Sequence, residues 1–313
     1  MIQNDKDMNK ENKRFTPLQK EIVSGLTAGS ITSIVVHPLD LIKLRLQLLS
    51  TDKTNLSSIH NNNLQKYKHV IRNIVTPIKN DLMINNLYRG LTINVLGNSI
   101  AWALYFASYR SFKTIIGISK NGNDWDNSMT YLISGGLAGI FTSIITNPIW
   151  VLKTRIMSTN KHSFNKSYDS ISSTYKSLIT KEGYKSLLKG LTPSILGVSQ
   201  GAIYFMIYDT LKQKKIQNNK NSRLSTKEII IITSISKMIS TSSVYPLQLL
   251  KSNLQSTNVI HSNNSMTTLN LATTIFKQNG IKGLYNGLAT NLFKAVPTTC
   301  ITFSIYEAMK GYL

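Results

Sequence analysis

The chain has 313 residues, and 36 Lys and Arg against 14 Asp and Glu give it a net charge of +22. Such an excess predicts an anionic partner, namely nucleic acid, acidic lipid or a phosphorylated solute. The single cysteine, Cys300, excludes an internal disulfide. The sequence shows no metal-ligand spacing, no phosphate loop and no nucleophile with its base, so we expect no enzyme, no metal and no resident cofactor.

Residues 1–15 form a polar tail of mixed charge. This tail lacks the apolar core of a secretory signal, and it does not have the Arg-rich, acid-poor composition of a transit peptide. Any address to an organelle is therefore expected to be internal. The rest of the chain divides into three repeats at 16–118, 126–216 and 226–313, joined by charged, Asn-rich linkers.

A motif that begins with proline recurs at 38–47, 148–157 and 246–255, at intervals of about one hundred residues. In each copy a polar or aromatic residue follows two positions after the proline, and a lysine follows five positions after it. Proline kinks a helix because it lacks an N–H group and crowds the preceding turn. Residues three apart share a helix face, so each repeat is expected to bend at its proline and direct a charged patch to one side.

Six stretches are almost free of charge and have about the 20 residues that an apolar helix needs to cross a bilayer. Two lie in each repeat, at 22–39, 91–109, 127–152, 191–208, 229–250 and 283–306. They are rich in Ser, Thr, Gly and Asn, and the mean hydropathy of the chain is −0.08. We therefore expect each helix to turn one face to lipid and the other to a watery cavity, which makes the fold an all-α membrane protein.

Short, weakly amphipathic stretches at 67–79, 168–181 and 267–278 follow a polar segment in each repeat, and we expect them to be helices on the membrane surface. The alternative is a soluble, basic helical-repeat protein that binds nucleic acid. We favour the membrane because the chain has no nucleic-acid motif. Its basic residues also avoid the apolar stretches instead of forming stripes along them, so we expect no nucleic-acid partner.

Two lysines, Lys237 and Lys294, stand inside the apolar stretches of the third repeat, where the first two repeats carry glycines. An ionisable side chain at membrane depth is costly and by default marks a pathway or a site. Snorkelling near a helix end is the alternative, but neither lysine lies near an end of its predicted helix. We expect both to contact an anionic ligand, with the alternative left more open for Lys237.

The motif at 38–47 reads Pro-x-acid-x-x-Lys-x-Arg-x-Gln, and an x-x-Gly triplet follows in each repeat at 88–90, 188–190 and 285–287. Over nearly the whole chain, this pattern resembles the mitochondrial carrier family. The resemblance implies six transmembrane helices around a pseudo-threefold axis in the mitochondrial inner membrane, with surface helices on the matrix side. It also implies alternating access through two gates, and cardiolipin near Arg89 and Lys189. We expect a monomer.

The resemblance places a gate at the matrix side, built from the three motifs. Asp40 is expected to pair with Lys153, Trp150 to make a cation–π contact with Lys251, and Gln248 to hydrogen-bond with Lys43. Gln47 and Gln255 are expected to brace this network. With one ion pair out of three, the gate is weak, which lets a bound substrate tip the balance between two states.

A second gate is expected at the cytoplasmic side. Here Asp209 can pair with Lys310, Glu307 can pair with Lys113, and Arg110 faces Lys212 as a repulsion. Ordinary solvated charges at helix ends are the alternative for both gates. The threefold placement of these residues favours the gates.

In this family the substrate contacts lie about seven residues past the glycine that starts the second helix of each repeat. In this chain those positions are Gly97, Asn98, Gly197, Val198 and Lys294. Gly197-Val198 resembles the family's adenine-contacting pair, Lys294 offers a point charge for phosphate, and Asn98 offers a donor and an acceptor. Trp102 could stack on a second ring, although a packing or lipid-interface role is equally open.

The runs at 97–106, 147–157 and 197–205 resemble the branch of the family that transports folate, FAD, NAD and pyrimidine nucleotides. Within this branch, the runs at 16–21, 208–213 and 245–255 are most similar to carriers of FAD. We therefore expect FAD as a transported substrate and not as a prosthetic group. NAD, folate and pyrimidine nucleotides stay open as alternatives, because a purine slot, a phosphate site and a second ring also suit them.

Overall fold

The computed structural model describes residues 17–49, 88–116, 124–158, 170–218, 225–256 and 267–312. Within these ranges it contains helices and no strand, which confirms the all-α class. The elements are, in chain order, α2 (Pro17–Leu49), α5 (Leu91–Ile116), α6 (Asp124–Ser158), α7 (Ile171–Glu182), the 3₁₀ helix η3 (Tyr184–Leu188), α8 (Leu191–Gly197), α9 (Ser199–Asn218), α10 (Thr226–Gln255), α11 (Thr268–Leu284) and α12 (Leu288–Tyr312).

The first helix of each repeat is long and carries its motif proline inside it. These helices, α2, α6 and α10, have 33, 35 and 30 residues. At 1.5 Å per residue they are about 45–53 Å long, which exceeds the roughly 30 Å of a bilayer's hydrocarbon core. The second helix of the repeat is α5, the pair α8 and α9, or α12.

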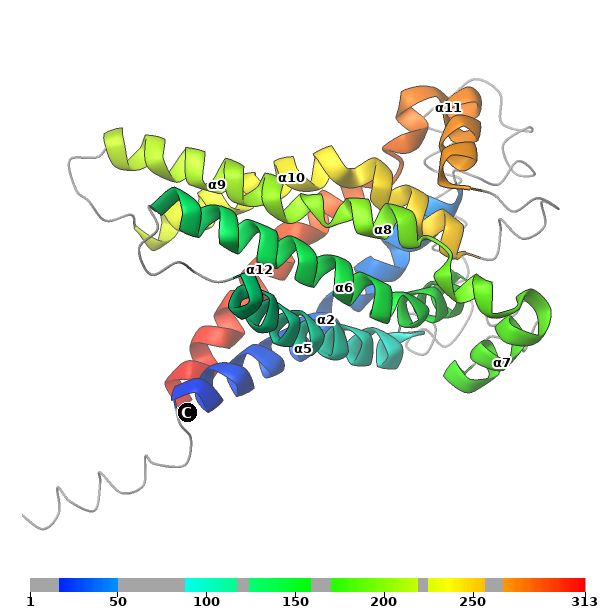
Figure 1. Cartoon of the computed structure of the whole chain (residues 1–313), viewed down its shortest axis with the longest axis horizontal. Coiled ribbons are helices and arrows are strands. Elements are labelled where there is room, and N and C mark those ends of the chain that lie inside the picture. Colours follow the sequence, from blue (N-terminus) through cyan, green and yellow to red (C-terminus); the bar gives the residue numbers. More distant parts are fainter. Residues whose placement is uncertain are drawn as a thin grey trace, which may run out of the picture.

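The helices close into a ring. The most extensive contacts join α5 to α6, α9 to α10, and α12 to α2 (Figure 1). The second helix of each repeat thus packs on the first helix of the next repeat, and the third repeat returns to the first. In addition α2, α6 and α10 contact one another. This arrangement is the threefold one that the repeated motif predicts.

One hydrogen bond closes each repeat on itself. The side chain before the motif proline donates to the backbone carbonyl before the glycine of the later triplet. His37 Nε2 donates to Arg89 at 3.0 Å, Asn147 Nδ2 to Lys189 at 3.2 Å, and the Tyr245 hydroxyl to Asn286 at 2.6 Å. An imidazole, an amide and a phenol therefore donate the same hydrogen bond at equivalent positions of the three repeats.

The glycines at these junctions have positive φ values of +80°, +73° and +84° at Gly90, Gly190 and Gly287. This backbone conformation costs an L-residue roughly 1–2 kcal/mol. A methyl group at Gly90 or Gly190 would also press on the last motif residue of the following repeat, 2.9 Å from Met157 or 3.0 Å from Gln255. At Gly287 it would lie 2.9 Å from the Tyr245 hydroxyl and 3.4 Å from Gln47, the last motif residue of the first repeat. The start of each second helix is therefore seated on the next repeat.

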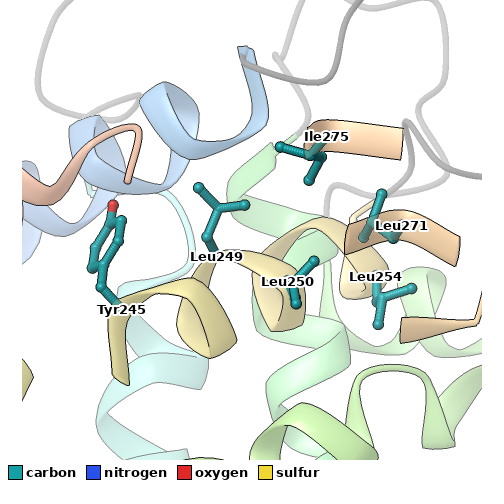
Figure 2. Packing of buried hydrophobic residues seen from close by; sticks show 6 residues of the cluster. All are labelled: Tyr245, Leu249, Leu250, Leu254, Leu271 and Ile275. Atoms are coloured by element: carbon teal, nitrogen blue, oxygen red, sulfur yellow. The ribbon is translucent and has the colours of Figure 1, made fainter. Parts of the chain in front are cut away.

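Two surface helices lie at the end of the bundle opposite the C-terminus, namely α7 and α11 (Figure 1). They occupy most of the predicted stretches at 168–181 and 267–278, whereas 67–79 lies outside the described residues. α11 packs on α10 through Leu271 and Ile275, which face Leu249, Leu250 and Leu254 (Figure 2). α7 is fastened to α6 by the ion pair of Glu182 with Arg155, at 3.0 Å.

Much of the apolar surface of the long helices faces outward. Two helical segments in the described ranges are long and apolar enough to cross a membrane, Met129–Ser158 and Tyr184–Gln217. Length and composition alone are weak support, since a core helix of a soluble protein passes the same test. However, only 22% and 17% of these windows are buried. Exposed apolar side chains also line the other long helices, at Ile31, Ile34 and Val35 of α2 and at Ile231, Ile235 and Ile239 of α10.

Tyr245→Phe is expected to destabilise the protein by about 1–3 kcal/mol, because the partly buried Asn286 carbonyl loses its donor and Gln47 loses an acceptor. Thermal unfolding of the purified protein would measure the effect. Tyr285→Phe is the matched control, since the Tyr285 ring stacks on Tyr245 but its hydroxyl makes no hydrogen bond within the described ranges. Equal losses for the two variants would contradict the role of the Tyr245 hydroxyl.

Glu182→Gln is expected to cost about 3 kcal/mol, because it removes the negative charge that pairs with the fully buried Arg155 guanidinium. Glu228→Gln removes the same charge from a pair with Lys215 that is 48% and 27% exposed. That change should cost less than about 1 kcal/mol. The two melting temperatures measured side by side would decide, and a Glu182 variant as stable as the Glu228 variant would refute the anchoring of α7.

Candidate functional site

Three lysines lie within electrostatic range of a single carboxylate inside the ring, and two more lie within range of those lysines. Lys43, Lys153, Lys237, Lys251 and Lys294, here called the basic cluster, come from α2, α6, α10 and α12. Lys43, Lys153 and Lys294 lie within electrostatic range of Asp40 on α2. Lys237 lies within range of Lys294, and Lys251 within range of Lys153. In the described part of the chain, Asp40 is the carboxylate that acts on these lysines, so the cluster has an excess of positive charge.

Asp40 forms its ion pair with Lys294 of α12. The sequence predicts Lys153 of α6 as its partner instead. Lys153 stays within electrostatic range, but its ammonium lies over the Trp150 ring, 4.9 Å from the centroid. The pairing with Lys294 follows from the ring, because α12 packs along α2.

Trp150 lies between two lysines of the basic cluster. The Lys251 ammonium is 5.9 Å from the centroid of the Trp150 ring, where the sequence predicts a cation–π contact. The same ring also faces Lys153, which the sequence does not predict. The indole N–H donates to the Thr146 hydroxyl at 3.0 Å and thereby fixes the orientation of the ring.

Gln248 belongs to a chain of amides and not to a contact with Lys43. Its Nε2 donates to Oε1 of Gln200 on α9 at 2.9 Å, and its Oε1 accepts from Asn291 on α12 at 3.5 Å. Gln200 in turn donates to the Thr241 hydroxyl at 3.1 Å. Sequence reasoning misses Gln200 and Asn291, although each lies one helical turn from a residue that it does select, Gly197 or Lys294.

Gln47 and Gln255 hydrogen-bond with the side chains that hold the starts of the second helices. Gln47 Nε2 donates to the Tyr245 hydroxyl at 3.0 Å. Gln255 accepts from Thr154 at 3.1 Å, and its Nε2 lies 3.4 Å from Oδ1 of Asn147. Tyr245 and Asn147 are two of the side chains that close their repeats. Gln47 therefore links the first repeat to the closing bond of the third, and Gln255 links the third repeat to the closing bond of the second.

The predicted substrate contacts on α5 divide between packing and open space. A methyl group at Gly97 would lie 3.0 Å from Ile149 and 3.5 Å from Trp150, so Gly97 serves the contact of α5 with α6. Asn98 Nδ2 donates to Asn94 at 3.4 Å. Trp102 is 58% exposed, stacks on Phe106 with ring centroids 5.6 Å apart and makes an edge contact with Tyr105 at 6.1 Å.

The pair at Gly197 and Val198 also divides. A methyl group at Gly197 would meet no atom within 4 Å, so its backbone faces open space. Val198 instead packs on Gly139 of α6, where a methyl group would lie 2.7 Å from its Cγ1. On the neighbouring α10, the Lys237 ammonium lies 6.0 Å from the centroid of the Tyr204 ring of α9. Further along α12 from Lys294, Cys300 is exposed.

The structure describes only part of the expected cytoplasmic gate. The side chains of Glu307 and Lys310 lie outside the described residues, so their pairing with Lys113 and Asp209 stays a prediction. Arg110 and Asp209 are exposed. The two described lysines lie near tyrosine rings, Lys113 at 4.7 Å from the centroid of Tyr131 and Lys212 at 5.8 Å from that of Tyr208.

The chain is similar to known proteins and to a protein-family model over nearly its whole length. A family model described as "Mitochondrial carrier protein" matches residues 15–120, 124–219 and 222–313. The chain is 45% identical to the mitochondrial FAD carrier protein FLX1 of Saccharomyces cerevisiae, over 96% of this chain and 99% of that protein. It is 34% identical to the mitochondrial nicotinamide adenine dinucleotide transporter 2 of Arabidopsis thaliana, over 91% and 77%. It is 32% identical to the mitochondrial nicotinamide adenine dinucleotide transporter 1 of Saccharomyces cerevisiae, over 96% and 80%.

Gly139→Ala and Gly197→Ala test which glycine faces open space. The first places a methyl group 2.7 Å from Val198 and should cost about 1–3 kcal/mol. The second adds a methyl group where no atom lies within 4 Å, so the stability should stay within about 0.5 kcal/mol of the original. Melting temperatures of the two purified variants measure the difference, and a larger loss for Gly197→Ala would show that this face is packed.

Proposed function

The chain belongs to the mitochondrial carrier family, and from this premise we propose that it transports FAD between the cytosol and the mitochondrial matrix. The observation that carries the proposal is the basic cluster, in which three lysines lie within electrostatic range of Asp40 and two more lie within range of those lysines. A dinucleotide with two phosphates supplies the anionic charge that this cluster lacks. The 45% identity to a FAD carrier over almost the full length of both chains supports FAD as the substrate.

We place the protein in the inner membrane with six transmembrane helices. The exposed apolar faces of α2, α6 and α10 support this placement, because water would leave them without partners. They also argue against the soluble nucleic-acid-binding alternative. In this orientation α7 and α11 lie on the matrix side, and the C-terminus lies on the other. A monomer, and cardiolipin bound near Arg89 and Lys189, belong to the same proposal.

Transport proceeds in our proposal by alternating access. The motif halves of α2, α6 and α10 are joined by bonds between repeats, among them Gln47 to Tyr245 and Thr154 to Gln255. This end of the ring is therefore the closed one, and the substrate enters from the cytoplasmic end. The matrix gate consists of Asp40, Lys43, Gln47, Trp150, Lys153, Gln248, Lys251 and Gln255. The cytoplasmic gate consists of Arg110, Lys113, Asp209, Lys212, Glu307 and Lys310.

Different residues of the site bind different parts of the substrate. The open backbone face of Gly197 accommodates the flat adenine ring, and Lys237 and Lys294 bind the two phosphates. The exposed ring of Trp102 stacks on the second heterocycle. NAD is the second candidate, because two of the relatives are nicotinamide adenine dinucleotide transporters and NAD carries the same adenine and diphosphate. Folate and pyrimidine nucleotides share fewer of these features.

Uptake by liposomes that contain the purified protein tests the proposal. Labelled FAD should enter, and NAD, folate and pyrimidine nucleotides should compete weakly. Lys294→Ala should reduce FAD uptake at least about tenfold, because a phosphate loses its cation, while Lys176→Ala on the exposed surface of α7 should leave uptake unchanged. Uptake of NAD without FAD would favour the second candidate, and transport by the Lys294 variant at the original rate would remove that lysine from the site.

A further inference from the structure

We propose that Asp40 competes with the substrate for Lys294. In the empty carrier the Asp40 carboxylate pairs with the Lys294 ammonium, and a diphosphate takes its place when it binds. The proposal rests on the proposed function for the location of the site, and it adds the charge that the ligand must carry. It assigns to Asp40 the part of a competitor in the empty carrier. The ligand class is a diphosphate or a diester of it, and not a monoanion.

The first step is that the ion pair can be reached by a ligand. The Lys294 and Asp40 side chains are 23% and 19% exposed, so they are neither sealed in a core nor free in water. They belong to α12 and α2, which pack along each other. A ligand in the ring can therefore displace the carboxylate without separating these helices.

The second step is that Asp40 has other partners ready. Lys153 and Lys43 both lie within electrostatic range of its carboxylate. A partly buried charge that loses its partner is costly, but Asp40 avoids that cost by moving toward Lys153. The pairing of Asp40 with Lys153 is the one that the repeated motif predicts, so the two pairings become two states of one carboxylate. When the ligand binds, the Asp40 carboxylate of α2 exchanges its ion pair with α12 for an ion pair with α6.

The third step is a count of charges. A monoanion that displaces Asp40 replaces one anion on Lys294 with another, which adds little to the binding free energy. A diphosphate has a second charge for Lys237, which lies within electrostatic range of Lys294 and has no carboxylate acting on it in the described ranges. Only the doubly charged ligand therefore gains a new pairing. An internal competitor of this kind lowers the apparent affinity by the fraction of time that it occupies the site.

A double-mutant cycle with inorganic diphosphate tests this on the purified full-length protein. The dissociation constant is measured at constant ionic strength by calorimetry or by the shift in melting temperature. Asp40→Asn should tighten diphosphate binding about tenfold, because the competitor is gone. In the Lys294→Met background the same change should alter the constant less than about twofold, since the place that Asp40 occupies no longer exists.

The background variant separates competition from a general effect of charge. If Asp40→Asn tightens binding equally with and without Lys294, only the electric field has changed and the proposal is wrong. An unchanged constant in the single variant also overturns it. Asp40→Ser gives the same comparison if Asp40→Asn does not fold, and Glu228→Gln controls for loss of a distant carboxylate. Because the probe is inorganic diphosphate, the result stands whether or not FAD is transported, and FAD uptake with an unchanged constant would defeat the competitor alone.

Discussion

The architecture depends on one hydrogen bond made three times, from the side chain before each motif proline to the carbonyl before each junction glycine. A carbonyl at the start of a helix, next to a glycine in the left-handed region, has no partner in the regular helical pattern. A side chain from the other helix of the repeat satisfies it. Because the junction also rests on the next repeat, the same bond fixes how the repeats succeed one another around the ring.

The scaffold is close to threefold, but the chemistry inside it is not. Two lysines of the third repeat stand where the others have glycine, and the motif carboxylate survives only in the first repeat, at Asp40. In the third repeat the corresponding residue, Gln248, belongs to a chain of neutral amides. A symmetric frame thus holds an asymmetric binding surface, which suits a substrate whose two ends differ.

The sequence predicts the helices and their order well, because proline, glycine and charge-free runs are local signals. It also predicts the two described surface helices, α7 to within three residues at each end and α11 except for its last six residues. Side-chain partners are harder, since they depend on how each helix is rotated against its neighbours. Asp40 therefore meets Lys294 instead of Lys153, Gly97 packs on α6, and His37, which no sequence motif singles out, closes the first repeat.

Cys300 gives the molecule an unusual practical property. It is the single thiol of the chain, it is exposed, and it lies on α12 beyond Lys294. A fluorophore or spin label attached there would follow the movement of α12 during a transport cycle, and no other cysteine would have to be removed first. The native polypeptide therefore carries its own attachment point for spectroscopy, on the helix whose Lys294 pairs with Asp40, the carboxylate of the matrix gate.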